Sequence, residues 1–407
     1  MPDRRATLLR PLFPLLAVFA LPAQAQDTDA WPDWLQEAMA RETPALDATQ
    51  FTVADGAIQL TVPGEPGELQ AFDGGWFVTS DIGATSPLVC MLYVDATDLA
   101  TLVASLGQAS LATQERKQDT PIARKLISSV DAGAIDGKPY VALEWFYTIG
   151  ESAGLIKIRA AANGPVMQAC THDGVGYRET FGRAFETFVK STRTPPDPEQ
   201  PYYEEILVQR LNDLDVGVGT LTFVRDAEGD SKIVRSISSL IPVTPDTLNY
   251  SDATTVSWST PDGELINAYS ATTDNGELLT DLEIGRDADG DWVVAGTFQG
   301  KPIETTIDGE VTPLSELGQI RAARELFAGT AETTAFMVWL DEADPTRIGE
   351  ARLTRDPEAA GRRARLEVGP LTMDFEFAVD GAVTGGTMQM GPVAIDVERI
   401  WHRGTPE

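Results

Sequence analysis

The sequence predicts an α+β sandwich domain followed by a mostly antiparallel β domain, which is a curled sheet, half-barrel or barrel with one helix. Three observations lead to this fold class. Apolar stripes at helical spacing alternate with strand-like runs before residue 194, a proline-rich segment divides the chain near its middle, and turn dipeptides recur every 9 to 14 residues after it. A chain of 407 residues with 43% hydrophobic residues is also long enough for about two domains.

Residues 1–25 have the three regions of a secretory signal peptide. Three arginines lie within the first ten residues, an apolar run covers 12–21, and Ala-Gln-Ala follows at 23–25. We therefore predict cleavage after Ala25 and a periplasmic mature protein. The apolar run is shorter than the roughly 20 residues of a membrane-spanning helix, so we expect no transmembrane anchor in the mature form.

The composition is strongly acidic. The 62 aspartate and glutamate residues outnumber the 31 lysine and arginine residues, which leaves a formal net charge of −31. Such a surface repels phosphate backbones and anionic headgroups at long range, so we expect no nucleic-acid partner.

The first domain is expected to cover residues 31–193, with helices laid on an antiparallel sheet. Its expected elements are a helix at 33–42, a strand at 57–62, a helix at 97–106, strands at 140–149 and 155–162, and a helix at 177–189. Gly107 follows the second helix and is expected to end it. The last helix has the strongest pattern, because its aromatic residues form one apolar stripe at helical spacing.

The closing helix at 176–193, which follows a strand-rich body, resembles the end of domains with the Mog1/PsbP-like α/β/α sandwich. The resemblance covers about 150 residues of this chain. That fold serves unrelated roles, so the resemblance implies a fold and no catalytic residues.

Residues 194–201 contain four prolines, which favours an extended, semi-rigid linker. The second domain is then expected at 202–403, where Asp-Gly and Asn-Gly pairs separate strand-like runs, as in a meander of hairpins. One helix interrupts these strands, with Thr312 as its cap, Pro313 in its first turn and Gly329 at its end.

The second domain resembles the curled sheets of LolA/LolB-like envelope proteins and of uncharacterised exported families with W-x-x-x-G strands. Here that pattern is Trp-Val-Val-Ala-Gly at 292–296. The resemblance implies a cavity for an apolar ligand.

The chain has two cysteines, Cys90 and Cys170, each in an apolar, strand-like run. An even count in an exported protein favours a disulfide across 80 residues, and two buried free thiols are the alternative. His172 shares a strand face with Cys170 and invites a thiol-hydrolase interpretation. A disulfide removes that nucleophile, so we predict no catalytic residues.

Metal sites and cofactors are not predicted either. The loop at 287–291 has carboxylates at alternate positions like a calcium loop, but Gly290 comes two positions early and Phe298 stands where the closing glutamate belongs. Met388 and Met390, with Met373 and His402, could form a copper(I) site, but methionines also fill irregular cores.

The final strands alternate cleanly, with one apolar and one acidic face. The apolar set forms our candidate ligand cavity and consists of Leu371, Met373, Phe375, Phe377, Val393, Ile395 and Val397. The acidic face carries Asp374, Glu376, Asp396 and Glu398. A strand at 383–390 is expected between the two. An open cavity and a core filled by the helix both give this alternation of apolar and polar residues, so the sequence does not decide between them.

These patterns favour an exported, noncatalytic binding or envelope-support protein with a lipophilic small molecule or an envelope protein as its partner. One alternative is a hydrolase built from dispersed carboxylates such as Asp173, Asp374 or Glu376. The other is a structural protein-interaction module without a ligand pocket, for which an exposed apolar patch is expected.

Overall fold

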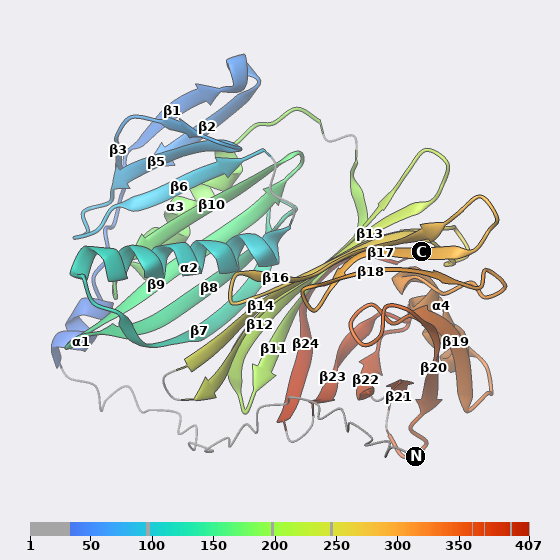
Figure 1. The fold of residues 1–407 in the computed structure, drawn as a ribbon. Helices are drawn as coiled ribbons and strands as arrows, with labels where there is room; N and C mark the ends of the chain where they lie inside the picture. Colours follow the sequence, from blue (N-terminus) through green and yellow to red (C-terminus); the bar gives the residue numbers. More distant parts are fainter. Residues whose placement is uncertain are drawn as a thin grey trace, which may run out of the picture.

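A computed structural model describes residues 33–94, 98–196, 199–244, 247–359, 361–369, 371–390 and 393–406 (Figure 1). The predicted signal peptide and its cleavage site after Ala25 lie outside the described residues. Within the described ranges, none of the helices has the length and apolar character needed to span a membrane.

The fold consists mostly of antiparallel sheet with four α-helices in the described part of the chain. The first sheet has strands in the order β3-β5-β6-β10-β9-β8-β7, and β4 pairs with β5. Its strands are β3 (Glu65–Pro66), β4 (Gln70–Phe72), β5 (Gly75–Asp81), β6 (Leu88–Tyr93), β7 (Ile122–Ile135), β8 (Lys138–Ile149), β9 (Ser152–Asn163) and β10 (Val166–Asp173). A separate hairpin joins β1 (Ala48–Val53) to β2 (Ile58–Pro63) through the short helix η2 (Ala54–Gly56).

Helices cover both faces of the first sheet (Figure 1). Helix α2 (Leu99–Gln118) packs on one face, while α3 (Arg178–Ser191) and the β1-β2 hairpin pack on the other. Helix α1 (Asp33–Met39) lies near the start of the described chain. The apolar stripe predicted for α3 is buried, because five of its members face the sheet: Phe181, Ala184, Phe185, Phe188 and Val189.

The prediction that Gly107 ends helix α2 is wrong. Asp98 caps its start by accepting a hydrogen bond from the Thr101 backbone N–H at 2.7 Å, and the helix continues to Gln118. Gly107 lies in mid-helix because the buried Trp145 ring occupies the space beside it. A Cβ at position 107 would lie 2.8 Å from Trp145 Cε2. The glycine therefore reflects packing and not helix termination.

Gly107→Ala is expected to lower the free energy of unfolding by about 1 kcal/mol. Alanine gains about 1 kcal/mol of helix propensity, but overpacking against a fully buried ring costs about 1–3 kcal/mol. Urea unfolding of both proteins measures the difference. In a Trp145→Phe background the smaller ring leaves room, so the same change should become stabilising. A stabilising Gly107→Ala in the parent protein would contradict this packing account.

The second sheet has 14 strands in the order β18-β17-β16-β15-β14-β13-β12-β11-β24-β23-β22-β21-β20-β19. The first eight strands are β11 (Pro201–Leu211), β12 (Leu214–Arg225), β13 (Ser231–Thr244), β14 (Thr247–Ser259), β15 (Leu265–Asp274), β16 (Glu277–Arg286), β17 (Trp292–Phe298) and β18 (Lys301–Ile307). The other six are β19 (Thr333–Trp339), β20 (Ile348–Arg355), β21 (Arg363–Val368), β22 (Leu371–Phe377), β23 (Val383–Met390) and β24 (Val393–Gly404).

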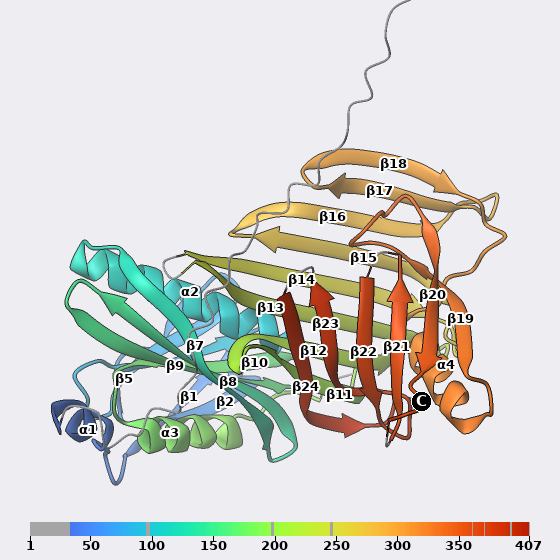
Figure 2. The same ribbon diagram turned by 90° about the horizontal axis from the view of Figure 1, so that it is seen from below.

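The second sheet is curled and open (Figures 1 and 2). Strands β18 and β19 form its two ends, and within the described residues they do not pair with each other. Of the alternatives that the sequence left open, a closed barrel is therefore wrong. The strand expected at 383–390 is β23, and it lies between β22 and β24 as predicted.

Helix α4 (Glu316–Ala328) lies against one side of this sheet. It starts later than predicted, because Ser315 caps it and accepts from the Gly318 backbone N–H at 3.4 Å. The Pro313 carbonyl instead accepts a hydrogen bond from the Leu265 N–H, which keeps this segment extended. The predicted end at Gly329 agrees with the C-cap in the structure.

Helix α4 bridges the two arms of the sheet. Leu317 packs in one cluster with Tyr203 and Phe223, while Leu326 packs in another with Leu353 and Ala364. We call the face on which α4 lies the inner face and the opposite one the outer face.

The two sheets share a hydrophobic core. Ile206, Val218 and Leu240 on the outer face of the second sheet pack in one cluster with Leu99 of α2 and Trp145 of β8. The chain passes from one sheet to the other between α3 and β11, at the proline-rich segment. The relative position of the sheets is therefore stabilised by this packing as well as by the connection.

Candidate functional site

The predicted apolar set lies on the inner face of the second sheet. Met373 is the register partner of Met388, which is in turn the partner of Ile395, so these side chains form one row across three strands. Phe377 packs against Phe327 of α4, with ring centroids 5.5 Å apart. This contact identifies the side of the sheet to which the whole set belongs.

Burial differs along this face. Val393 and Ile395 are buried, in a cluster that also contains Leu211 and Val216. The other five members of the predicted set are partly exposed: Leu371, Met373, Phe375, Phe377 and Val397. The packing of α4 therefore leaves part of this apolar surface in contact with solvent.

The acidic residues of these strands lie on the outer face, as alternation predicts. Asp374 pairs with Arg365 at 2.9 Å, and Glu376 pairs with Arg363. Asp173, the third carboxylate of the hydrolase alternative, lies on β10 of the other sheet. The structure does not bring these three carboxylates together.

A buried ion pair lies on the inner face beside the apolar set. Arg399 Nη1 lies 3.6 Å from Glu205 Oε2, and these side chains are 8% and 5% exposed. The same nitrogen donates to the Tyr203 hydroxyl at 3.2 Å, and that hydroxyl donates to Glu205. Burial raises the pKa of Glu205 to about 7, against the lowering effects of Tyr203 and Arg399.

A second charged cluster joins α4 to the same face. Arg235 of β13 lies 3.9 Å from Glu316 of α4 and 3.4 Å from Glu342. Ser270 donates to Asp341 at 2.9 Å. Burial raises the pKa of Asp341 to about 6, and the charge of Glu342 acts in the same direction. Of these contacts, the one between Arg235 and Glu316 joins α4 to the inner face.

Neither charged cluster was among the sites predicted from the sequence. Glu205 could have been noticed, because it interrupts an otherwise apolar row of inward positions between Tyr203 and Leu207. Its pairing with Arg399 depends on β11 lying beside β24, and no local pattern indicates that pairing.

The predicted disulfide is present, and it joins strands that pair directly. Cys90 of β6 and Cys170 of β10 are register partners, with an S–S distance of 2.10 Å. Both cysteines of the sequence are therefore oxidised. The thiol-hydrolase interpretation of Cys170 and His172 fails, because that chemistry requires a free thiolate.

The surroundings of His172 form a cleft of about 310 Å³ in the first part of the chain. His172 is 2% exposed, and its Nε2 lies 3.4 Å from Ser86 Oγ. Asp173 accepts a hydrogen bond from the Tyr147 hydroxyl at 3.1 Å. Burial, followed by the charge of Lys157, lowers the pKa of His172 to about 4, so the ring is neutral at pH 7.

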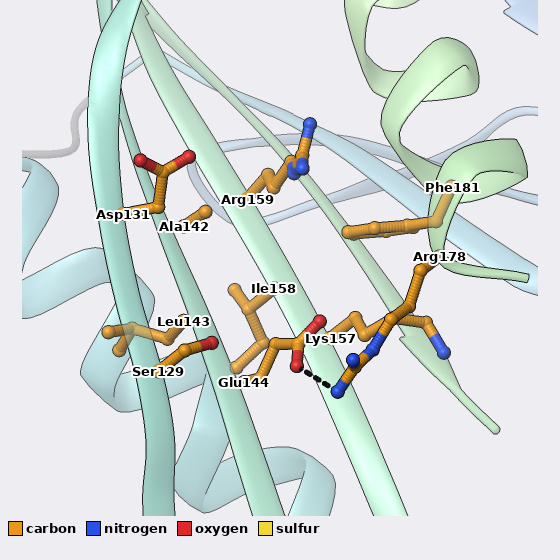
Figure 3. Close-up of a pocket in the computed structure, with 10 residues that line it drawn as sticks. All are labelled: Ser129, Asp131, Ala142, Leu143, Glu144, Lys157, Ile158, Arg159, Arg178 and Phe181. Atoms are coloured by element: carbon orange, nitrogen blue, oxygen red, sulfur yellow. Dashed lines mark hydrogen bonds and ion pairs between the residues drawn. The ribbon is translucent and has the colours of Figure 1, made fainter. Parts of the chain in front are cut away.

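A smaller hollow of about 80 Å³ lies nearby, between β7, β8, β9 and α3 (Figure 3). Figure 3 shows Glu144 and Arg178 pointing toward each other, and they form an ion pair at 2.6 Å. Arg159 lies over the Phe181 ring at 5.8 Å. Lys157 donates to the carbonyls of Gly174 and Gly176, which ties the segment before α3 to the sheet. The charged groups here have structural partners.

The loop at 287–291 is a hairpin turn. The Asp287 carboxylate accepts hydrogen bonds from the backbone N–H groups of Asp289 and Asp291, and Gly290 has a φ of +91°. The similar sequence at 225–230 forms the same turn, in which Asp226 accepts from Glu228 and Asp230. Among the described residues, no three or more His, Cys, Asp or Glu side chains are grouped to hold a metal ion.

Comparisons with known proteins find distant structural likeness. No protein-family model matches the chain, and no curated protein matches it. Fourteen chains of solved structures match. One is a beta-barrel-like protein of the domain of unknown function DUF1849 from Brucella abortus, 11% identical, with a TM-score of 0.39, covering 50% of this chain and 98% of its own.

Two further solved structures match with lower TM-scores. Cyanobacterial PsbP from Synechocystis is 12% identical, with a TM-score of 0.26, over 36% of this chain and 92% of its own. A DUF1089 family protein from Pseudomonas aeruginosa is 14% identical, with a TM-score of 0.22, over 44% of this chain and 86% of its own. Together these matches indicate a distant resemblance among β-rich folds.

Proposed function

We propose that this chain is a noncatalytic binding protein of the cell envelope that holds a lipophilic ligand against the inner face of its second sheet. The observation that carries the proposal is that part of the apolar set on the inner face, next to α4, is exposed to solvent. The partly exposed residues include Met373, Phe375 and Val397. Large apolar side chains that share one sheet face and stay in contact with water favour an apolar ligand.

In this proposal the binding energy comes from covering apolar surface. Covering about 300 Å² of apolar surface would contribute about 7.5 kcal/mol at 25 cal/mol per Å², before the entropy cost of association. The members of the predicted set that such a ligand could contact are the partly exposed ones: Leu371, Met373, Phe375, Phe377 and Val397.

The envelope location is part of the same proposal. It is supported by the signal-peptide pattern at 1–25, and the disulfide is compatible with an oxidising compartment. We also propose that the first part of the chain has the Mog1/PsbP-like sandwich fold and that the second part has a LolA/LolB-like curled sheet.

Two measurements test this function. Native mass spectrometry of the protein purified from its own envelope is expected to show a copurified lipophile. A fluorescent fatty acid is expected to bind the purified protein. Met373→Asp should weaken the affinity for this fatty acid about tenfold, because the ligand would then have to desolvate a charge on the apolar face.

Ala394→Asp is the matched control, because Ala394 lies on the outer face of β24 and is exposed. The affinity of this variant for the fluorescent fatty acid should remain within about twofold of the parent value. Absence of both a copurified lipophile and fatty-acid binding would contradict the proposal. Equal weakening by the two variants would contradict the inner face as the site.

A further inference from the structure

The cleft beside His172 is lined by hydroxyl groups whose protons are already used. Its volume of about 310 Å³ lies at the lower end of the range for small-molecule sites. Tyr147, Ser86 and Asp173 are among the residues that line it. Tyr147 donates its hydroxyl proton to the Asp173 carboxylate at 3.1 Å, and Ser86 donates to the Asp173 backbone carbonyl. Toward a ligand, both hydroxyl oxygens can therefore act only as acceptors.

The tautomer of His172 agrees with this assignment. The ring is neutral at pH 7, and its Nε2 lies 3.4 Å from Ser86 Oγ. Because the Ser86 proton is donated to a carbonyl, the hydrogen-bond network places the ring proton on Nε2, which donates to Ser86 Oγ. A hydroxyl oxygen has two lone pairs, so one lone pair of Ser86 remains for a ligand.

The Asp173 carboxylate is partly buried and has an unused oxygen. Its Oδ1 accepts from Tyr147, and in the part of the chain that the structure describes its Oδ2 has no hydrogen-bond partner. Lys157 donates instead to two backbone carbonyls of the segment before α3. Burial raises the pKa of Asp173, although the Tyr147 hydrogen bond and the charges of Lys117 and Lys157 lower it. The cations around this carboxylate therefore do not compensate for its burial.

We propose that this cleft binds a small primary amine, with the ammonium group of the ligand at Asp173 and its carbon chain against the apolar part of the wall. An ammonium group has three N–H donors, and the oxygens of Asp173, Tyr147 and Ser86 supply three acceptors. Ala84 and Val175, which also line the cleft, are partly exposed and suit a short carbon chain. This site goes beyond the proposed function, because it lies beside the first sheet and takes a cation.

A primary amine suits the cleft better than a metal ion does. Calcium takes six to eight oxygen ligands, whereas Asp173 is the only carboxylate among the described residues that line the cleft. The cleft is also far larger than a bare ion, which leaves room for an organic substituent. The formal net charge of −31 attracts cations to the protein at long range.

The test compares three probes with the same carbon chain: butylammonium, butanol and butyltrimethylammonium. Binding to the full chain is followed at neutral pH through the amide chemical shifts of Gly174 and Val175 in NMR titrations. Butylammonium should bind at least about tenfold more tightly than the other two, because butanol lacks the charge and butyltrimethylammonium lacks N–H donors. Asp173→Asn should weaken butylammonium binding about tenfold and leave butanol affinity within about twofold.

Asp131→Asn is the matched control. Asp131 accepts from the Tyr140 hydroxyl at 3.1 Å, as Asp173 does from Tyr147, but it lines the hollow of about 80 Å³. This variant should keep the parent affinity for butylammonium within about twofold. If Asp173→Asn fails to fold, Ser86→Ala keeps the carboxylate, removes one acceptor and should weaken butylammonium binding about fivefold.

Three results would overturn this inference. They are equal binding of the three probes, absence of amide shifts at the cleft with butylammonium, and equal weakening by Asp173→Asn and Asp131→Asn. None of these results bears on the lipophile proposed for the second sheet, because that ligand is tested with a fatty acid and with variants of the other sheet.

Discussion

Replacing Cys90 and Cys170 together by alanine is expected to lower the free energy of unfolding by about 4.5 kcal/mol. The disulfide joins cysteines 80 residues apart in the sequence. Its main effect is to lower the conformational entropy of the unfolded chain, which makes unfolding less favourable. Alanine is the appropriate replacement, because both sulfurs are buried in an apolar cluster with Phe181 and Phe188.

Urea unfolding of the parent and double variant, each with and without reductant, measures this effect. The parent should lose stability on reduction, and the double variant should not respond. A difference below about 1 kcal/mol between the oxidised parent and the variant would contradict the loop-entropy account.

The second large effect is a dependence of stability on pH that comes from His172. Burial lowers the pKa of His172 from 6.5 in the unfolded chain to about 4 in the folded protein. Between these values the unfolded state binds more protons than the folded state, so stability falls as pH decreases from about 6.5 to about 4. The shift corresponds to about 3 kcal/mol across that window.

His172→Phe is expected to remove this part of the pH dependence. Phenylalanine suits the site, because the ring lies among Tyr177 and Phe181, and the buried Nδ1 has no hydrogen-bond partner within the described structure. The difference between the unfolding free energies at pH 7 and pH 4 should therefore be about 3 kcal/mol smaller in the variant than in the parent protein. His402, the other histidine, is exposed, so His402→Gln should keep the parent profile. An unchanged profile in His172→Phe would show that the buried ring does not control it.

Much of the element pattern could be predicted from sequence, because it depends on local spacing. The apolar stripe of α3 and the alternation of β22 and β24 are of this kind, and the structure places their faces as predicted. The errors come from tertiary contacts. Gly107 remains inside α2 because Trp145 fills the space beside it, and Pro313 remains extended because its carbonyl pairs with Leu265.

In the candidate site, too, local spacing could be predicted from the sequence and tertiary contacts could not. Alternation alone identified the apolar row, but it could not show how far α4 covers that row. The Glu205 and Arg399 pair joins β11 and β24, which are the first and last strands of the second sheet in chain order but lie side by side in it. Such a contact depends on the order of strands in the sheet, which no single-sequence pattern specifies.

A crystal structure of the protein with a bromine-labelled fatty acid, analysed by anomalous scattering, tests the central claim most directly. We expect bromine density against the inner face of the second sheet, in contact with the partly exposed Met373 or Phe375. Bromine density only in the cleft near His172, or only on the outer face, would contradict it.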